Sequence, residues 1–408
     1  MAVSAVMQLP ASQDTRFSRV DRYIQQEYID TGRLAGAQIA IQHRGTIHRR
    51  CLGFLDRERA RPMNPDCIFR IFSMSKPITC VAAMVLVERG LMRLHDEVAR
   101  YIPSWAGLKV RGGARARPMR VVDLLTHCSG LTAGFQYRTE IDALYRQSLS
   151  MRSDGPDLGA FVQELSRFPL EFEPGTAWNY SVSTDVLGFV IQEVSGQSFR
   201  DFLKTQIFDP LNMTDTDFYV PAAKGARLAE CYVRRSGEPL GQLRDSFEPD
   251  LTAMPTFYSG GGGLLSTTSD YLSFASAILS RGEREQPRLL SPETWKLMST
   301  NHLPGGKDLR SVAQGMFRED SYVGVGFGLG CATTINATTA GLRGTPGDTF
   351  WSGMANTFFW CDPVEQLIGI FMTQILPSDV YPLQLEIREL TYHAVREDDR
   401  RRLYESTN

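Results

Sequence analysis

Apolar residues follow a helical spacing near the start of the chain and a strand-like alternation soon afterwards. A helix over residues 16–30 would carry on one face Phe17, Val20, Ile24 and Tyr28. The next segment, AGAQIAIQHRGTIHRRCLGF (35–54), has the pattern of two strands that join at Arg44-Gly45. The chain is therefore predicted to begin with a helix and a β-hairpin.

A third predicted strand, Ile68 to Phe72, runs directly into a long apolar segment. Pro77 lies near the start of that segment, and proline is tolerated only in the first turn of a helix. Gly90 is a natural stop. We therefore predict a buried helix that begins near Ser73 and ends near Gly90.

The middle of the chain is mostly helical in pattern, and strand patterns return late. Residues 96–216 favour helices and loops, and further helices are expected after the cap-like residues Ser266 and Ser291. Segments rich in β-formers follow between residues 322 and 376, and a last helix is expected over residues 382–397. Strands at both ends with helices between them indicate one α/β domain built from both termini, with a mainly helical domain inserted.

Length and charge narrow the class of protein. A chain of 408 residues exceeds one ordinary domain. Because 44 basic residues balance 46 acidic ones, nothing in the composition recruits nucleic acid or an anionic membrane. The first 14 residues lack the basic and apolar regions of a secretory signal, and the chain has no apolar run long enough for a transmembrane helix. We expect a cytoplasmic protein.

Cysteine and histidine usage argues against a metal site or a disulfide framework. The seven cysteines are odd in number and scattered, and no C-x-x-C pair occurs. The six histidines form no H-E-x-x-H or similar ligand cluster. We therefore expect no metal and no cofactor.

Ser73 and Lys76 lie three residues apart where the predicted strand meets the helix. Residues at i and i+3 share a helical face, so the Lys76 amine can lie beside the Ser73 oxygen. Burial disfavours an ammonium, so a partly desolvated Lys76 would act as base or proton carrier for a serine nucleophile. The N–H groups that begin a helix suit an oxyanion. The alternative is a capping serine with an exposed lysine, because roughly one or two S-x-x-K are expected by chance.

Two further segments carry candidate chemistry. In EPGTAWNYSVSTD (173–185), a phenol at Tyr180 held near an ammonium could take a proton from a serine and give it to a leaving group. The alternative is ordinary packing of a half-buried tyrosine. In DTFWSGMANTFFW (348–360), Gly353 permits close approach of a ligand, and the Met354 amide could bind an oxyanion. The alternative is a plain hairpin with a packed tryptophan.

These elements, in the order S-x-x-K, Y-x-x and W-x-G, resemble the serine β-lactamase and penicillin-binding protein superfamily. The branch that the chain resembles most is the class C β-lactamase-like carboxylesterases, or family VIII-type esterases. Four other segments resemble recurrent family segments in family order: LLTHCSGL (124–131), PLNMTDTDF (210–218), SGGGGLLSTTSDYLSFA (259–275) and GVGFGLG (324–330). The resemblance covers about residues 16–396.

The resemblance implies a fold and a set of roles. The family fold is an antiparallel sheet flanked by helices, plus a helical domain, so the class is α/β, more strictly α+β. The expected division is 1–95 and 321–408 for the α/β domain and 96–320 for the mainly helical domain. Ser73 would be the acylated nucleophile, with Lys76 and Tyr180 sharing the proton transfers. The backbone amides of Ser73 and Met354 would form the oxyanion hole.

Two departures from the lactamase-like pattern bear on the substrate. Y-x-N is replaced by Tyr180-Ser181-Val182, which loses an amide that would meet a substrate's acylamido group. K-T-G is replaced by Trp351-Ser352-Gly353, which puts an indole where a cation would meet a carboxylate. An unmet polar group costs about 1–3 kcal/mol, so weak or absent β-lactamase activity is expected.

The leading hypothesis is therefore a serine carboxylesterase that hydrolyses small-molecule, short-chain acyl esters through an acyl-enzyme. An acyltransferase, a β-lactamase or an amide or peptide hydrolase of the same superfamily is the alternative, and a non-hydrolysing binding protein is a remote one. Trp351, Ser352 and Gly353 are expected to contact substrate, as are two aromatic residues that follow LLTHCSGL, Phe135 and Tyr137. His127 is expected to make a structural hydrogen bond, and Gly260–Gly263 to form a tight turn before a helix.

Overall fold

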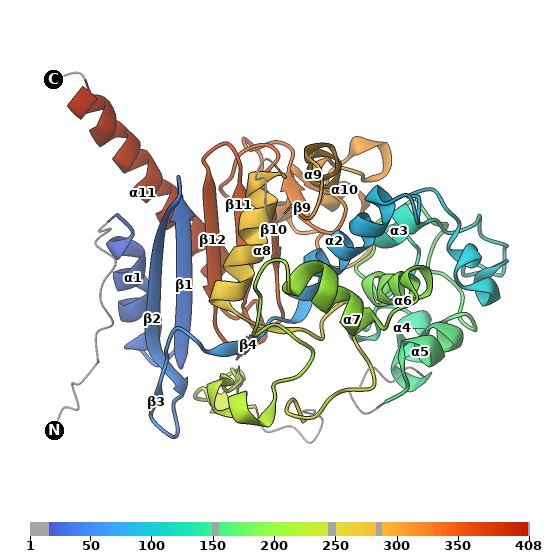
Figure 1. Cartoon of the computed structure of the whole chain (residues 1–408), viewed down its shortest axis with the longest axis horizontal. Coiled ribbons are helices and arrows are strands. Elements are labelled where there is room, and N and C mark those ends of the chain that lie inside the picture. The colour runs from blue at the N-terminus through green and yellow to red at the C-terminus, as the bar shows by residue number, and fades with distance from the viewer. Residues whose placement is uncertain (1–15, 149–154, 244–249, 283–287, 407–408) are drawn as a thin grey trace.

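An eight-stranded antiparallel sheet forms one half of the molecule (Figure 1). The computed structural model describes residues 16–148, 155–243, 250–282 and 288–406. The strand order is β3-β2-β1-β12-β11-β10-β9-β8. The bounds are β1 Gly36–His43, β2 Thr46–Asp56, β3 Arg61–Pro62, β8 Val325–Phe327, β9 Ala332–Thr334, β10 Thr349–Ser352, β11 Phe358–Asp362 and β12 Leu367–Met372. N-terminal β1 pairs directly with C-terminal β12, so the sheet is built from both ends of the chain, as predicted.

The first hairpin has the turn that its sequence indicates. β1 and β2 are joined at Arg44-Gly45, where both residues have positive φ, 48° and 84°. Two consecutive residues with positive φ suit the twist of a two-residue hairpin loop. The helix predicted before this hairpin is also present, as α1 (Ser18–Ile24) and a continuing turn, η1 (Gln25–Ile29).

Helices cover both faces of the sheet. On β11, Phe359 contacts Tyr271 of α8 (Thr268–Ser280), whereas its neighbour Trp360 lies under the Arg388 guanidinium of α11 (Leu383–Ser406). Because successive side chains of a strand point to opposite faces, α8 and α11 lie on opposite sides of the sheet. α1 packs with α11, so the first and last helices of the chain lie together (Figure 1).

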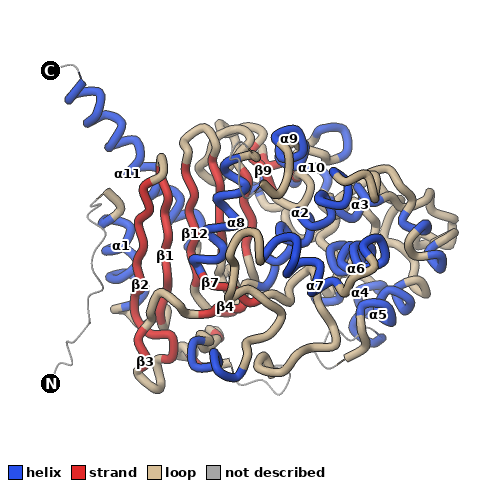
Figure 2. Tube along the Cα trace, in the orientation of Figure 1, coloured by secondary structure: helices blue, strands red, loops and turns tan. Residues whose placement is uncertain are grey.

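The other half of the molecule is mainly helical (Figure 2). Its central contact is between α2 (Ser75–Glu88) and α6 (Ser183–Ser195), both buried over most of their length. The remaining helices are α3 Val121–Leu125, α4 Glu140–Ser148, α5 Leu158–Leu165, α7 Phe199–Leu203, α9 Pro292–Ser299 and α10 Leu309–Val312. Short 3-10 or π turns are η3 Val98–Arg100, η4 Pro103–Trp105, η5 Gly134–Gln136, η6 Lys204–Phe208, η7 Ala222–Arg227, η8 Pro304–Gly306 and η9 Asp320–Tyr322. The domain boundaries at 95/96 and 320/321 stay a prediction.

The third predicted strand is shorter than expected and lies outside the main sheet. β4 (Ile68–Arg70) pairs with β7 (Leu265–Thr267) in a separate two-stranded sheet. A second small sheet joins β13 Ile375–Leu376, β5 Tyr232–Val233 and β6 Gly241–Gln242. After β4, Phe72 has a φ of 43°, and the chain makes a 3-10 turn, η2 (Phe72–Met74), before α2 begins at Ser75. Ser73 therefore lies in the turn before the α-helix and not in the helix itself.

The first 15 residues, on which the expectation about a secretory signal rested, lie outside the described residues. Within the described ranges, no helix is long and apolar enough to cross a membrane.

Candidate active site

The η2 turn that carries Ser73 is fixed by hydrogen bonds to neighbouring backbone. The Ser75 hydroxyl donates to the Phe72 carbonyl at 2.6 Å and accepts from the Leu264 amide at 3.1 Å. One buried hydroxyl thus ties η2 to the segment before β7. The backbone around Ser73 is therefore held by contacts from a part of the chain some 190 residues away.

Two proton-handling groups meet on the Ser73 hydroxyl. The Lys76 Nζ lies 3.2 Å from Ser73 Oγ, and the Tyr180 hydroxyl lies 2.6 Å from the same oxygen. The Lys76 Nζ also lies 4.5 Å from the centroid of the Tyr180 ring. Both side chains are buried, at 5% and 6% exposure. Heavy-atom distances of about 2.6–3.2 Å are those required for general acid–base transfer, so this trio can move a proton from the serine.

An aromatic cluster surrounds Tyr180. Its ring lies 5.9 Å from that of Trp351 and 5.5 Å from that of Phe317, measured between centroids. Further ring contacts to Tyr180 come from His127, Phe135 and Trp178. The wall beside Ser73 is therefore apolar on the side of Trp351, where lactamase-like sequences carry a lysine.

The W-S-G segment lies at the end of β10, against the strand that leads to Ser73. A β-carbon added at Gly353 would lie 2.3 Å from the Ile71 carbonyl oxygen, so only glycine permits this approach. Met354 follows directly, with a half-exposed side chain. Trp351 is buried and Ser352 half-buried. Gly353 therefore packs against the backbone two residues before Ser73, and the role of the Met354 amide as an oxyanion donor stays a prediction.

The remaining predicted residues differ in what they contact. Phe135, on η5, is exposed and reaches Tyr180, with ring centroids 6.2 Å apart. Tyr137 packs instead beneath the Arg146 guanidinium of α4, 4.0 Å from its ring centroid. His127 is hydrogen-bonded through Nδ1 to the Ser181 hydroxyl at 3.0 Å, and burial with the nearby Lys76 charge holds its pKa well below the ordinary value. A neutral, structural His127 fits its predicted role.

A buried carboxylate that sequence reasoning missed lies beneath Lys76. Asp185, in the first turn of α6, accepts hydrogen bonds on Oδ1 from the Ser259 hydroxyl at 2.5 Å and the Gly261 amide at 3.0 Å. The Gly261 carbonyl in turn accepts from Lys76 Nζ at 2.6 Å. Burial raises the pKa of Asp185, and the Lys76 charge opposes that effect. The sequence signal that could have indicated this residue is an aspartate at the start of an apolar helix, five positions after Tyr180.

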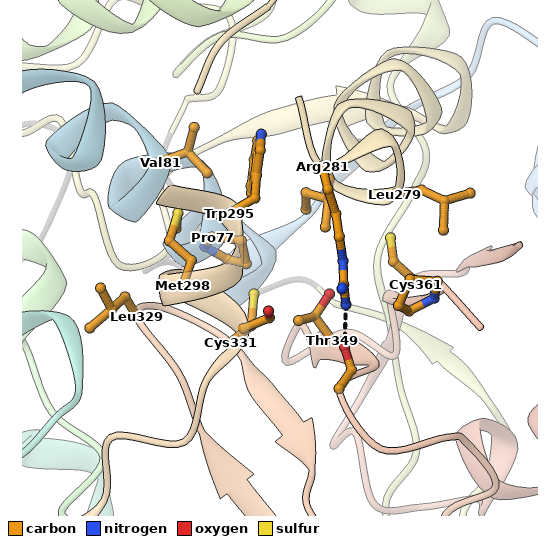
Figure 3. Close-up of a pocket in the computed structure, with 14 residues that line it drawn as sticks. Pro77, Val81, Leu279, Arg281, Trp295, Met298, Leu329, Cys331, Thr349 and Cys361 are labelled. Atoms are coloured by element: carbon orange, nitrogen blue, oxygen red, sulfur yellow. Dashed lines mark hydrogen bonds between the residues drawn. The ribbon is translucent and has the colours of Figure 1, made fainter. Parts of the chain in front are cut away.

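A separate cavity is lined in part by Pro77 and Val81 of α2 (Figure 3). Its volume is about 30 Å³, and the residues around it are mostly apolar, including Val81, Trp295 and Leu329. Arg281 reaches across it to donate to the Gly347 carbonyl at 3.1 Å. Such a volume holds about one or two water molecules, so this cavity is too small for an ester.

Fold and site together define a serine hydrolase. An antiparallel sheet flanked by helices stands beside a helical region, and a Ser-Lys-Tyr trio lies where η2 and α2 meet the loop before α6. The chain belongs to the Beta-lactamase family, whose model matches residues 20–391. The resemblance drawn from the three short motifs is therefore confirmed.

Comparison with individual proteins gives the same placement. Protein Rv1367c of Mycobacterium tuberculosis is 34% identical over 86% of this chain and 88% of its own. Esterase EstB of Burkholderia gladioli is 30% identical, over 88% of this chain and 91% of its own. The solved structure of EstCE1, described as a hydrolase with promiscuous acyltransferase activity, superposes with a TM-score of 0.80 at 26% identity, and covers 93% of this chain and 99% of that one.

Proposed function

We propose that the protein is a serine carboxylesterase that hydrolyses short-chain acyl esters through an acyl-enzyme on Ser73. The observation that carries this proposal is the Ser73 oxygen with Lys76 Nζ and the Tyr180 hydroxyl both in hydrogen-bond reach. The esterase relatives support it, because EstB and EstCE1 are a named esterase and a named hydrolase. The indole of Trp351 supports an uncharged ester over a β-lactam, because it offers no cation to a carboxylate.

The reaction has two balanced steps. Ser73 Oγ attacks the ester carbonyl carbon, and its proton passes to the Lys76–Tyr180 pair. The negative charge on the former carbonyl oxygen is met by the amides of Ser73 and Met354. The carbon–oxygen bond to the alcohol breaks, and Tyr180 or Lys76 returns the proton to the departing oxygen. Water then repeats the sequence on the acyl-enzyme, which releases the acid and free Ser73.

Acyl transfer is a second candidate, favoured by the description of EstCE1. The first step is the same, and an alcohol replaces water in the second. The apolar wall beside Ser73 favours acyl transfer only if an alcohol binds against that wall better than water does. Products formed in the presence of an added alcohol therefore distinguish the two.

The test compares a chromogenic butyrate ester with a chromogenic cephalosporin, using wild type, Ser73→Ala and the control Ser299→Ala. Ser299 is half-buried and its hydroxyl donates only to the Lys296 carbonyl among the described residues, so its loss should change neither activity. We expect ester hydrolysis that disappears in Ser73→Ala, with little cephalosporin opening. Added 1-butanol should yield the free acid as the main product; mostly butyl butyrate would assign transfer instead. Turnover by Ser73→Ala at the wild-type rate would exclude this mechanism.

A further inference from the structure

Asp185 is connected to the Ser73 hydroxyl by a chain of hydrogen bonds. Its carboxylate accepts from the Gly261 amide, the Gly261 carbonyl accepts from Lys76, and Lys76 lies against Ser73. Each link lies between 2.6 and 3.2 Å. The backbone of Gly261 therefore links Asp185 of α6 to Lys76 of α2.

The glycine run 260–263 is needed for this coupling because the backbone must approach closely. A β-carbon at Gly261 would lie 2.6 Å from Asp185 Oδ2, and one at Gly260 would lie 2.6 Å from the Thr184 carbonyl oxygen. Thr79, one turn after Lys76, donates to the Gly260 carbonyl at 2.8 Å. The segment predicted to be a tight turn thus offers backbone carbonyls to side chains of α2. Neither Gly260 nor Gly261 has a positive φ, so the close approach and not the backbone conformation is what requires glycine there.

The charges around Asp185 single out Lys76 as its partner. Asp185 is 2% exposed, and a buried carboxylate is costly unless it is paired and hydrogen-bonded. From α2, a positive charge on Lys76 lowers the pKa of Asp185 against the effect of burial, whereas the Cys80 thiol is neutral because burial raises its pKa to about 12. His127, after α3, is neutral as well because its pKa is well below the ordinary value. The phenol of Tyr180 lies over Lys76 from the other side.

We propose that Asp185 is a positioning residue, which holds the Gly261 carbonyl against Lys76 and balances the positive charge that Lys76 carries when it takes the Ser73 proton. This inference rests on the proposed function, because it assigns Lys76 a proton. Asp185 touches neither Ser73 nor a reacting atom and acts through Gly261 and Lys76. Its removal should change how Ser73 reactivity depends on pH, which a merely structural residue would not do.

The experiment measures how fast a fluorophosphonate probe labels Ser73 between pH 5 and 10. In labelling, a bond forms between Ser73 Oγ and phosphorus, the phosphorus–fluorine bond breaks, fluoride leaves and the serine proton passes to the Lys76–Tyr180 pair. The rate therefore reports the protonation of that pair without requiring the natural ester. The variants are Asp185→Asn, which keeps the carbonyl oxygen and loses the charge, and Asp185→Ala, which loses both.

Asp270→Asn is a closely matched control. Asp270 occupies the same first-turn position on α8 and is also buried, and it accepts from the Thr216 hydroxyl and the Asp215 amide, both at 2.8 Å. Burial raises its pKa as it does that of Asp185, but no Lys76 contact is among its interactions in the described chain. Asp185→Asn and Asp270→Asn should therefore both lower the stability of the protein. Only Asp185→Asn should change the pH profile of labelling.

We expect the acid limb of the Asp185→Asn profile to move to lower pH by about half a unit or more, because a nearby carboxylate favours the protonated form of a base and the variant removes that carboxylate. Asp185→Ala should label about tenfold to a hundredfold more slowly at every pH, because Gly261 no longer holds Lys76 in place. Asp270→Asn should keep the wild-type profile. If the Asp185 variants do not fold, Ser259→Ala loosens the same carboxylate and should slow labelling severalfold.

The outcomes that overturn the inference are distinct from those that overturn the proposed function. If the Asp185→Asn profile coincides with that of wild type, Asp185 has no charge role. If Asp185→Ala is labelled at the wild-type rate, Asp185 has no positioning role. Where only Ser259→Ala folds, a wild-type labelling rate in that variant gives the same answer. If the wild type itself is not labelled at Ser73, the proposed nucleophile fails instead.

Discussion

The indole of Trp351 lies flat against the ring of Phe317, with an angle of 12° between the planes and 5.4 Å between centroids. Phe317 has a φ of 71°, which a bulky residue adopts at an energetic cost. The stack therefore accompanies a strained backbone, and both rings also contact Tyr180. Strain of this kind tends to persist where it positions a functional group, which here is an aromatic wall beside the serine.

Phe317→Ala should reduce turnover of esters with an aromatic alcohol more than of esters with a small one. Tyr180 must reach the departing oxygen, so the alcohol is expected on the side of Tyr180 and Phe317. Loss of an aromatic contact of about 0.5–1.5 kcal/mol should lower kcat/KM for 2-naphthyl acetate roughly threefold to tenfold. Methyl acetate, followed by titration of the released acid, should change little. An equal loss for both esters would place the alcohol elsewhere.

Gly353→Ala should impair catalysis by displacing the expected oxyanion donor. The added methyl group meets the Ile71 carbonyl and the Thr357 hydroxyl, each at 2.3 Å, so β10 must move away from the segment that carries Ser73. The loss of one oxyanion donor costs about 10²- to 10³-fold in kcat. Gly241→Ala is the control, since its β-carbon would meet nothing within 4 Å. Undiminished kcat in Gly353→Ala would argue against a donor at Met354.

Tyr180→Phe should lower kcat about 10²-fold or more while the protein stays folded, because a phenol 2.6 Å from Ser73 is lost and its ring packing is kept. Steady-state kinetics with the butyrate ester measure kcat, and a thermal unfolding curve shows whether the variant is folded. Tyr145→Phe is the matched control and should keep kcat, because Tyr145 is a buried residue of α4 whose ring contacts Phe168. If the pH–rate profile of Tyr180→Phe is that of wild type, Lys76 alone handles the proton.

The fold was largely accessible from sequence because its signals are local. The alternation in residues 35–54 and the Arg44-Gly45 turn predict the hairpin without reference to the rest of the chain. The S-x-x-K, Y-x-x and W-x-G motifs are likewise short, and their order along the chain indicates the family. In the structure the Ser73, Lys76 and Tyr180 side chains meet on one oxygen, as that order predicts.

The features that could not be predicted from the sequence depend on contacts between residues far apart along the chain. β4 pairs with β7 almost 200 residues away, which draws it out of the main sheet and leaves Ser73 in a 3-10 turn. Phe317 lies in a loop without periodicity, so its place beside Trp351 follows only from tertiary structure. The left-handed backbone at Tyr137 and its contact with Arg146 likewise follow only from tertiary structure, and the expected contact of Tyr137 with substrate stays a prediction.

His127 offers a test of the difference between structure and catalysis near Tyr180. Its pKa is well below the ordinary value of 6.5 in the folded protein, chiefly through burial, so the unfolded chain binds more protons below that pH. The free energy of unfolding should therefore fall as the pH drops below about 6.5, by about 1.4 kcal/mol per pH unit. Urea unfolding at pH 7.5, 6 and 5 measures this slope.

His127→Asn should remove that part of the slope and keep ester turnover. Asparagine tolerates the φ of 55° at this position and can still bond the Ser181 hydroxyl, so the backbone is expected to hold. If His127 were instead the base for Ser73, the variant would lose turnover and the acid limb of its pH–rate profile together. An unchanged pH dependence of unfolding in the variant would mean that His127 is protonated in the folded state.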